Sequence, residues 1–389
     1  METDREKSLF AFRPDPGAVR KRMIREAEEL YRMGLEQKRH QPVYENADGL
    51  LEKVYLYPTF RCPLRCPYCY AEGGTRESEE MSGADLTRIT REAVGAGYRA
   101  VVIVGGEPLV YHDLNTYLEG LKAIERGKTK FVLRTSFAFP VKDSLMQTLC
   151  QCFDEIVVSV DGTEKTHDAV RGKGTWKHAT ENIRRALDTG GKIAVNAVLD
   201  EDKKNGGDGA FLRAFCRENG IEKLVMQSAI PMGRALDFRR MPYYEWRSVN
   251  KASDEVVPSF SCGLGRSLYV QPDGKAFPCF AWCEKEHQVG DLSRESLKEI
   301  LDRGKLLALI NSGVDTNEKC KRCEVRYFCG GMCKIWVEDK TDPDSGNFDC
   351  ASTKARYLRM LKEYGIIGED GRPAAGERFS PTVSEQEGR

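Results

Sequence analysis

The chain has 389 residues, with 60 basic and 60 acidic side chains and therefore no formal net charge. A balanced charge creates no field that would attract nucleic acid or an anionic membrane, so we expect neither as a partner. Apolar residues make up 40% of the chain, enough to bury one large domain and a smaller one. No apolar run approaches the roughly 20 residues of a membrane-spanning helix, and the first residues lack a secretory apolar segment, so we expect a cytoplasmic protein.

Residues 1–50 form a charged N-terminal extension with apolar residues at helical spacing between Pro16 and Lys38. This spacing predicts a helix packed on the main domain. From residue 52 onward, strand-like and helix-like segments alternate. The predicted strands are 54–57, 100–104, 130–134, 155–160, 192–199 and 223–227, and the predicted helices lie near 82–95, 113–125, 141–152, 177–188 and 208–218. Six such units indicate an α/β fold with a parallel sheet, and they are too few for an eight-stranded barrel, so we expect an open, partial (β/α)6 TIM-like barrel.

The periodicity weakens after Pro231, and from Cys262 onward cysteines are spaced through Gly-rich sequence with few strand-like segments. We therefore expect a core domain at 51–235 and a second domain at 236–365, in which metal sites replace much of the core. Fourteen cysteines in a chain without a signal peptide favour metal ligation in a reducing compartment over disulfides. The polar residues 366–389 are expected to be a disordered tail.

Three cysteines, Cys62, Cys66 and Cys69, follow the first predicted strand with the spacing CxxxCxxC. Three thiolates on one loop can hold three irons of a [4Fe–4S] cube and leave the fourth iron free for another ligand. Zinc is the alternative, although structural zinc sites use four ligands, commonly as two CxxC pairs. The loop lies at the carboxyl edge of the predicted sheet, where parallel α/β folds bind their ligands.

The triplet resembles the CxxxCxΦC signature of the radical SAM superfamily, with Tyr68 in the aromatic position. The resemblance implies that S-adenosylmethionine (SAM) binds the open iron and is cleaved reductively to a 5′-deoxyadenosyl radical, which takes hydrogen from a substrate. It also implies the partial barrel. A reductant such as flavodoxin or ferredoxin is the expected electron donor, and an exposed cluster would make the protein oxygen-sensitive.

Further segments resemble the cofactor-binding motifs of the same family. Gly105-Gly106-Glu107 ends the second predicted strand and resembles the GGEP motif, in which glycines allow close approach and the carboxylate would take the methionine ammonium. The resemblance implies SAM contacts from Tyr68, Ser159, Arg171, Asn196 and Met226, with a core role as the alternative for Met226. Arg171 would bind the cofactor carboxylate. His167 is expected to be a hydrogen-bonding group and not a catalyst.

The C-terminal cysteines resemble the SPASM extension, whose pattern is C…Gx4C…Cx2Cx5Cx3C…C. The resemblance implies two auxiliary [4Fe–4S] clusters, giving three in all, and the alternative is structural zinc. The outer cluster would be held by Cys320, Cys323, Cys329 and Cys350. The inner one would be held by Cys262, Cys279 and Cys333, with Cys283 or the substrate as its fourth ligand. The remaining cysteines on predicted helices, Cys150, Cys152 and Cys216, are expected to be small core residues.

The resemblance favours an enzyme that modifies a ribosomally made peptide or a protein side chain. A sulfatase-maturing activity is disfavoured, because Phe280 stands where that group carries an aspartate base. No recognisable leader-binding domain is present, so a separate leader-binding protein is one possible partner. The alternatives are a dehydrogenase or decarboxylase of a small molecule and, in another class, a non-catalytic iron–sulfur or zinc protein.

Overall fold

The computed structural model describes residues 16–36, 38–77, 79–230, 232–235, 258–331 and 350–374. The chain divides into two compact units, each built from separated stretches of sequence. One unit comprises residues 43–250 and 263–311, and the other comprises residues 1–42, 251–262 and 312–389. We refer to them as the sheet unit and the helical unit. None of the helices in the described ranges is long and apolar enough to cross a membrane.

The sheet unit is built on a nine-stranded sheet in the order β6-β5-β4-β3-β2-β1-β7-β8-β9. Its first six strands are β1 (Lys53–Leu56), β2 (Ala100–Ile103), β3 (Lys130–Thr135), β4 (Glu155–Ser159), β5 (Ile193–Val198) and β6 (Lys223–Gln227). All neighbouring pairs among them are parallel. The expected α/β fold with an open parallel sheet is therefore confirmed.

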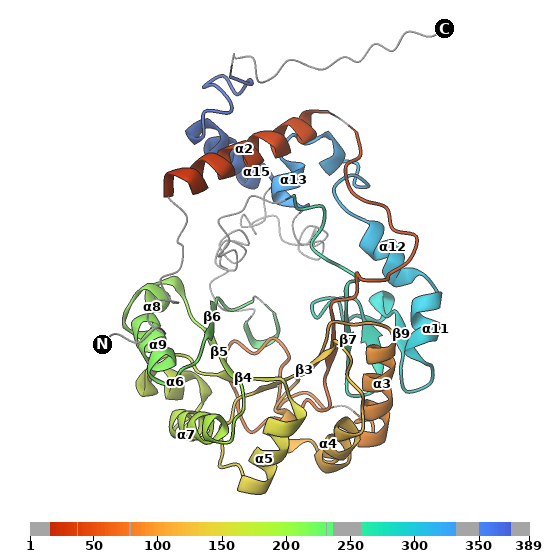
Figure 1. Ribbon diagram of the computed structural model, residues 1–389, viewed down its shortest axis with the longest axis vertical. Coiled ribbons are helices and arrows are strands. Elements are labelled where there is room, and N and C mark those ends of the chain that lie inside the picture. The colour runs from red at the N-terminus through yellow and green to blue at the C-terminus, as the bar shows by residue number, and fades with distance from the viewer. Residues whose placement is uncertain are drawn as a thin grey trace, which may run out of the picture. The chain divides into compact units, whose positions relative to one another are not determined.

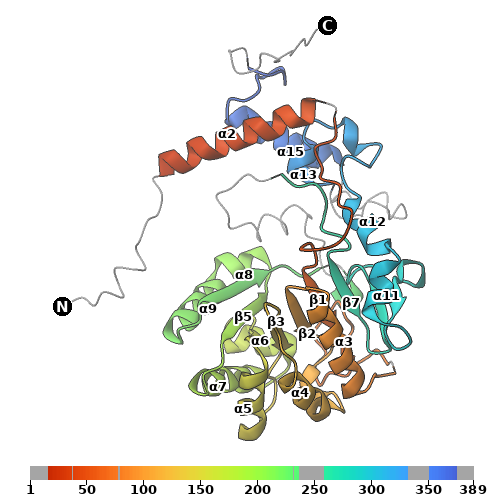
Figure 2. The same cartoon turned by 45° about the vertical axis from the view of Figure 1, so that its right-hand side comes forward.

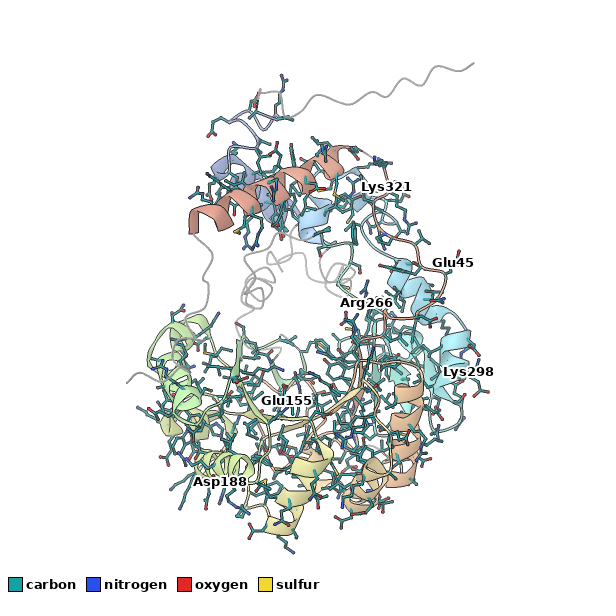
Figure 3. All side chains as sticks on the ribbon, in the orientation of Figure 1. Glu45, Glu155, Asp188, Arg266, Lys298 and Lys321 are labelled. Carbon is teal, nitrogen blue, oxygen red and sulfur yellow. The ribbon has the colours of Figure 1, made fainter. Side chains whose placement is uncertain are left out.

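Helices cover the outer side of this sheet, as Figures 1 and 2 show for α3, α4, α5 and α7. The helices between the strands are α3 (Gly83–Gly95), α4 (Leu114–Lys122), α5 (Asp143–Cys152), α6 (Glu164–Arg171), α7 (Thr175–Asp188), α8 (Glu201–Asn205) and α9 (Gly207–Glu218). Side chains fill the space between the helices and the sheet (Figure 3). Strand residues such as Leu56, Leu133 and Ile156 are fully buried in this core, whereas alternate residues face the inside of the curved sheet.

Three strands that the sequence did not predict extend the sheet beyond β1. They are β7 (Ser267–Val270), β8 (Lys275–Phe277) and β9 (Gly290–Asp291), followed by α11 (Leu297–Asp302) and α12 (Lys305–Asn311). β7 runs parallel to β1, and β8 and β9 are antiparallel. The expectation of a strand-poor region after Cys262 was therefore wrong, because these short strands gain their stability from pairing with the main sheet.

The helical unit contains α2 (Pro16–Leu35), α13 (Arg326–Cys329) and α15 (Cys350–Glu363) around a small apolar core. The N-terminal helix α2 contributes Ala27, Leu30 and Tyr31 to this core. It packs on α13 within the helical unit, and its packing on the main domain stays a prediction. From the expected disordered tail, Ile366 and Ile367 are buried in the same core, and residues 375–389 lie outside the described ranges.

Arg326 joins α2 to α13 from inside the helical unit. Its side chain is 2% exposed, and its guanidinium donates to the carbonyl oxygens of Gly34, Lys38 and Cys323 and to the Asp315 carboxylate. The last carbonyls of a helix have no partner within the helix, so a cation at this end stabilises it. Gly34 is required here, because a Cβ would lie 1.9 Å from the Glu324 carbonyl oxygen.

Candidate functional site

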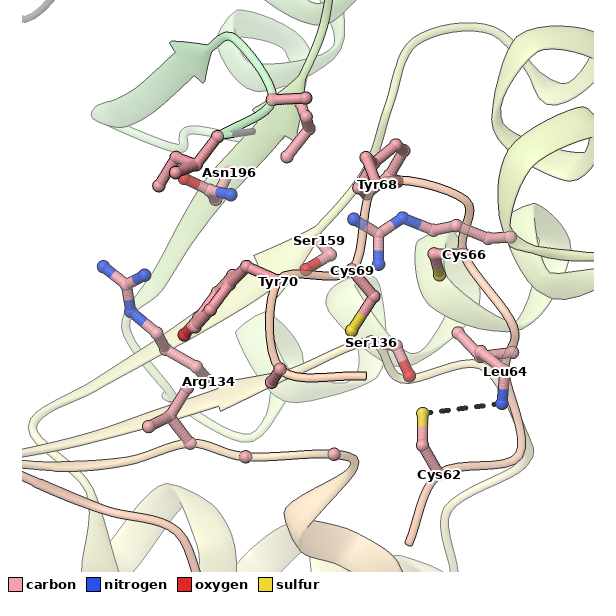
Figure 4. Close-up of a pocket in the computed structure, with 18 of the residues that line it drawn as sticks. Cys62, Leu64, Cys66, Tyr68, Cys69, Tyr70, Arg134, Ser136, Ser159 and Asn196 are labelled. Atoms are coloured by element: carbon pink, nitrogen blue, oxygen red, sulfur yellow. Dashed lines mark hydrogen bonds between the residues drawn. The ribbon is translucent and has the colours of Figure 1, made fainter. Parts of the chain in front are cut away.

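A pocket lies at the carboxyl edge of the parallel strands in the sheet unit (Figure 4). It contains about 1020 Å³ of empty space, part of which is open to solvent. Its lining includes nine residues singled out from the sequence, namely Cys62, Cys66, Cys69, Tyr68, Gly105, Gly106, Ser159, Arg171 and Asn196. The alternation of β4 and β5 turns Ser159 and Asn196 inward, away from the helices. Motifs from four separate stretches of sequence therefore meet in one place.

The cysteine loop is held in shape by hydrogen bonds within the sheet unit. The Leu64 amide donates to the Cys62 sulfur at 3.4 Å, and the Cys69 amide donates to the Cys66 carbonyl oxygen at 3.2 Å. Arg234, from outside the loop's own sequence, donates to the Cys66 carbonyl oxygen at 3.0 Å and so stabilises the loop conformation.

Burial raises the pKa of the Cys62 thiol to about 12, and the nearby Cys66 and Cys69 act in the same direction. Three thiols that share a pocket and influence one another fit the donor set of an iron–sulfur cluster with one open position. Among the described residues, no three Cys, His, Asp or Glu side chains are arranged to hold a single metal ion.

The glycine-rich end of β2 lies directly against the cysteine loop. A Cβ on Gly106 would lie 2.3 Å from the Arg61 carbonyl oxygen, and Gly105 has φ +138° with 2.6 Å to the Thr59 carbonyl oxygen. Only glycine fits such close backbone contacts. The two glycines therefore bring their own backbone groups to the pocket.

Glu107, the next residue, does not line this pocket. Its carboxylate is 1% exposed and accepts hydrogen bonds from the Thr135 hydroxyl at 2.7 Å and from the Ser136 amide at 2.8 Å. The Ser136 hydroxyl adds a third bond at 2.5 Å. This carboxylate thus links the end of β2 to the end of β3, and its contact with the cofactor ammonium stays a prediction.

A buried ion pair between Arg171 and Asp161 holds Tyr68 of the cysteine loop by a hydrogen bond. Arg171 donates through Nε to Asp161 at 2.6 Å, and the Tyr68 hydroxyl donates to the same carboxylate. Burial raises the pKa of Asp161, but the charge of Arg171, both side-chain bonds and the Val198 amide together lower it below its usual value. The carboxylate is therefore charged and fixes both Tyr68 and Arg171 at the pocket wall.

His167 lies behind this ion pair with 1% exposure. Its Nδ1 accepts a hydrogen bond from the Asp161 amide at 3.2 Å. Burial, reinforced by Arg171, lowers the pKa of His167 to about 4. The imidazole is thus a neutral hydrogen-bond acceptor.

Met226 packs against the apolar core, whereas its neighbours Gln227 and Ser228 line the pocket. Successive strand residues face opposite sides, so the residue after Met226 is the one that faces inward. Met226 is partly buried against the core, which agrees with its alternative role, and its contact with the nucleoside stays a prediction. Arg134 on β3 also lines the pocket and was missed, although a cation directly after the apolar stretch 131–133 was a usable signal.

The four cysteines predicted for the outer cluster all lie in the helical unit. Cys320 and Cys323 are in one short turn, Cys329 ends α13, and Cys350 begins α15. Burial raises the pKa of Cys320 to about 11, and the thiols of Cys329, Cys350 and Cys323 add to this increase. The fold therefore brings the four thiols into one neighbourhood, as a four-thiolate cluster requires.

The inner set is divided between the two units. Cys279 and Cys283 belong to the sheet unit, Cys262 belongs to the helical unit, and Cys333 lies outside the described residues. The Cys283 thiol donates to the Phe280 carbonyl oxygen at 3.3 Å. Phe280 makes an edge contact with Tyr70, which follows the cysteine loop, with ring centroids 5.3 Å apart.

The three cysteines expected in the core are found there. Cys152 and Cys216 are 0% and 4% exposed, and the half-buried Cys150 packs against the same cluster.

Family models match two parts of the chain. Residues 56–201 match the radical SAM superfamily, and residues 262–324 match the SPASM iron-sulfur cluster-binding domain. Among curated proteins, the chain is 24% identical to PqqA peptide cyclase from Methylorubrum extorquens, over 81% of this chain and 87% of the relative. It is also 24% identical to the antilisterial bacteriocin subtilosin biosynthesis protein AlbA from Bacillus subtilis, covering 70% of this chain and 65% of the relative.

Among solved structures, the fold resembles that of Streptococcus suis SuiB bound to S-adenosylmethionine. The TM-score is 0.62 at 21% identity, with 75% of each chain covered. The two matched domains use [4Fe–4S] clusters and SAM as cofactors. The first match contains the whole cysteine loop, and the second contains Cys262, Cys279, Cys283, Cys320 and Cys323. The chain is therefore a radical SAM enzyme with a C-terminal SPASM domain.

Proposed function

We propose that this enzyme modifies a ribosomally made peptide or a protein side chain. The observation that carries the proposal is the pocket in which Cys62, Cys66 and Cys69 meet the glycine-rich end of β2. The names of two relatives, a peptide cyclase and a bacteriocin biosynthesis protein, support a peptide as the substrate. A structure of SuiB bound to the precursor peptide SuiA, at 22% identity and TM-score 0.62, is consistent with a peptide substrate for this fold.

The proposed roles follow from what each side chain faces. The three thiolates would hold a [4Fe–4S] cluster, which when bound supplies the electron that cleaves SAM to the 5′-deoxyadenosyl radical. The backbone at Gly105 and Gly106 would bind the methionyl ammonium, together with the Glu107 carboxylate, which Thr135 and Ser136 hold in position.

Arg171 presents an edge of its guanidinium to the pocket and would take the cofactor carboxylate beside Ser159. Asn196 would contact the nucleoside, and Tyr68 holds Asp161 in place. Two auxiliary clusters are proposed for the SPASM cysteines, with Cys283 as a ligand of the inner one. We further propose a cytoplasmic location, a flavodoxin or ferredoxin as reductant, and a separate leader-binding protein.

Anaerobic cleavage of SAM tests the reaction class. The full chain is reconstituted with iron and sulfide, reduced with dithionite and assayed for 5′-deoxyadenosine by mass spectrometry. Wild type should form it, and Cys66→Ala should lower the yield at least about a hundredfold because the open cluster loses one of three thiolates. The matched control Cys216→Ala removes a core cysteine that is 4% exposed and should keep the activity.

A wild-type protein that carries about twelve irons and forms no 5′-deoxyadenosine would refute the proposal. The substrate class needs a second experiment, in which the enzyme is coexpressed with a short peptide encoded beside its gene. A change in the mass of that peptide, absent with Cys66→Ala, is the expected result.

A further inference from the structure

Three arginines line the pocket, and two of them are engaged by the protein itself. Arg171 is paired with the buried Asp161. Arg234 donates to the carbonyl oxygens of Cys66 and Gly73 and to the Thr75 hydroxyl. Both therefore have a structural role that accounts for their charge.

The third cation, Arg134, has no such partner. It lies in β3 and is exposed, while Leu133 and Thr135 on either side are buried, so its side chain faces the inside of the sheet. Within the part of the chain that the structure describes, no carboxylate pairs with Arg134. A guanidinium presented to a pocket without an acidic partner is a binding site for an anionic ligand group, because it offers two parallel donors to a carboxylate.

A second polar group in the pocket also lacks a partner. Ser228 is 3% exposed, and within the described ranges its hydroxyl has no hydrogen-bond partner. A buried hydroxyl without a partner is costly, so it indicates that a polar ligand completes the site. Arg134 lies in β3 and Ser228 directly follows β6, and both side chains line the same pocket.

The position of Arg134 indicates which ligand it meets. Its charge lowers the pKa of Tyr70, although burial raises that pKa overall, so the two side chains are neighbours. Figure 4 shows the Arg134 guanidinium on the far side of Tyr70 from Cys69. Tyr70 in turn contacts Phe280, which lies between Cys279 and Cys283. Arg134 therefore lies on the side of the pocket near Tyr70 and Phe280, away from Arg171, which would bind the cofactor.

We propose that Arg134 binds a carboxylate of the substrate, so that the enzyme selects peptides with an acidic residue at or next to the modified position. This inference rests on the proposed function for its peptide, but the carboxylate site itself does not depend on radical chemistry. Arg134 would determine specificity by leaving a neutral analogue with an unpaired guanidinium.

Binding without reductant tests the site separately from catalysis. Acetyl-glutamyl amide and acetyl-glutaminyl amide differ only in the side-chain charge and serve as probes. They are titrated by calorimetry under argon into the cluster-loaded, SAM-bound enzyme. Wild type should bind the glutamyl probe about tenfold or more tightly than the glutaminyl probe, the size expected for a charge-assisted bidentate contact.

Arg134→Gln should abolish this preference, and Arg134→Lys should retain part of it. The affinity for SAM should change less than about threefold in both variants. Lys130→Gln, an exposed cation at the start of the same strand, is the matched control and should behave as wild type.

Three results would overturn the proposal. The first is that wild type binds both probes equally or binds neither. The second is that the preference for the glutamyl probe persists in Arg134→Gln. The third is a tenfold weaker affinity for SAM in Arg134→Gln, which would assign Arg134 to the cofactor. If the preference is found but no 5′-deoxyadenosine forms, the proposed function fails and the carboxylate site stands.

Discussion

Each of the two units contains a tyrosine, an aspartate and an arginine that interact close to its cysteine motif. In the sheet unit, Tyr68 donates to Asp161, which pairs with Arg171, and the Arg171 cation lies 5.6 Å from the centre of the Tyr68 ring. We name this set the pocket triad. In the helical unit, Tyr327 donates to Asp315 at 2.8 Å, Asp315 pairs with Arg326 at 3.0 Å, and the Arg326 cation lies 4.5 Å from the Tyr327 ring. We name this set the clasp triad.

The difference between the two triads lies in what the arginine does with its remaining donors. Arg326 directs them to carbonyl oxygens of α2, its following loop and the cysteine turn, so it is enclosed by protein. Arg171 pairs with Asp161 alone in the described structure and also lines the pocket. An Asp–Arg pair thus stabilises the fold where backbone carbonyls surround the arginine. Where one side of the arginine faces a pocket, the same kind of pair positions the arginine for a ligand.

The largest effects are expected when the aspartate of either triad is removed. Asp315→Ala and Asp161→Ala each leave an arginine buried without its partner, and each should lower the free energy of unfolding by about 3–5 kcal/mol. Urea unfolding under argon measures this. Asp315→Ala should also lose about four irons, those of the outer cluster, while Asp161→Ala should keep them and weaken SAM binding. Equal iron loss in both variants would mean that the triads do not act locally.

The stability of the sheet unit should depend on pH through the buried His167, which has no counterpart in the clasp triad. His167 is neutral when buried, with a pKa of about 4 against an ordinary 6.5. Protonation therefore favours the unfolded chain, so this contribution is fully present above pH 6.5 and falls by about 3 kcal/mol as the pH drops to 4.

Urea unfolding at pH 7.5 and 5.5 measures the change. His167→Asn keeps an acceptor that does not titrate and should reduce the pH dependence of the sheet unit. An unchanged dependence in that variant would assign it to other groups.

The smallest effect is expected from the two tyrosine hydroxyls. Tyr68→Phe and Tyr327→Phe each remove one hydrogen bond to a charged carboxylate, which should cost about 1.5–2 kcal/mol. Thermal unfolding compares the two. Only Tyr68→Phe should also weaken SAM binding, since Tyr68 lines the pocket and Tyr327 is enclosed in the other unit. A weaker affinity in Tyr327→Phe would contradict the assignment of the clasp triad to structure alone.

Much of the cysteine-loop site was predictable from local sequence. Spacing placed Cys62, Cys66 and Cys69 on one loop, and the order of strands placed Ser159 and Asn196 at the same edge of the sheet. The hydrogen bonds that hold Glu107 were not predictable, because a motif does not reveal which neighbour donates to a buried carboxylate, here Ser136. Ser228 was missed because an isolated hydroxyl after a strand carries no pattern.

The sequence by itself determined the donor chemistry and the parallel α/β architecture, because cysteine spacing and apolar periodicity are local properties of the chain. Only the tertiary structure decided where long-range partners meet. It placed β7 beside β1, α2 on α13, and Arg134 in the pocket with no carboxylate partner among the residues that the structure describes. These arrangements depend on burial and on pairing between residues that are distant in the sequence, and such contacts exist only once the whole chain has folded.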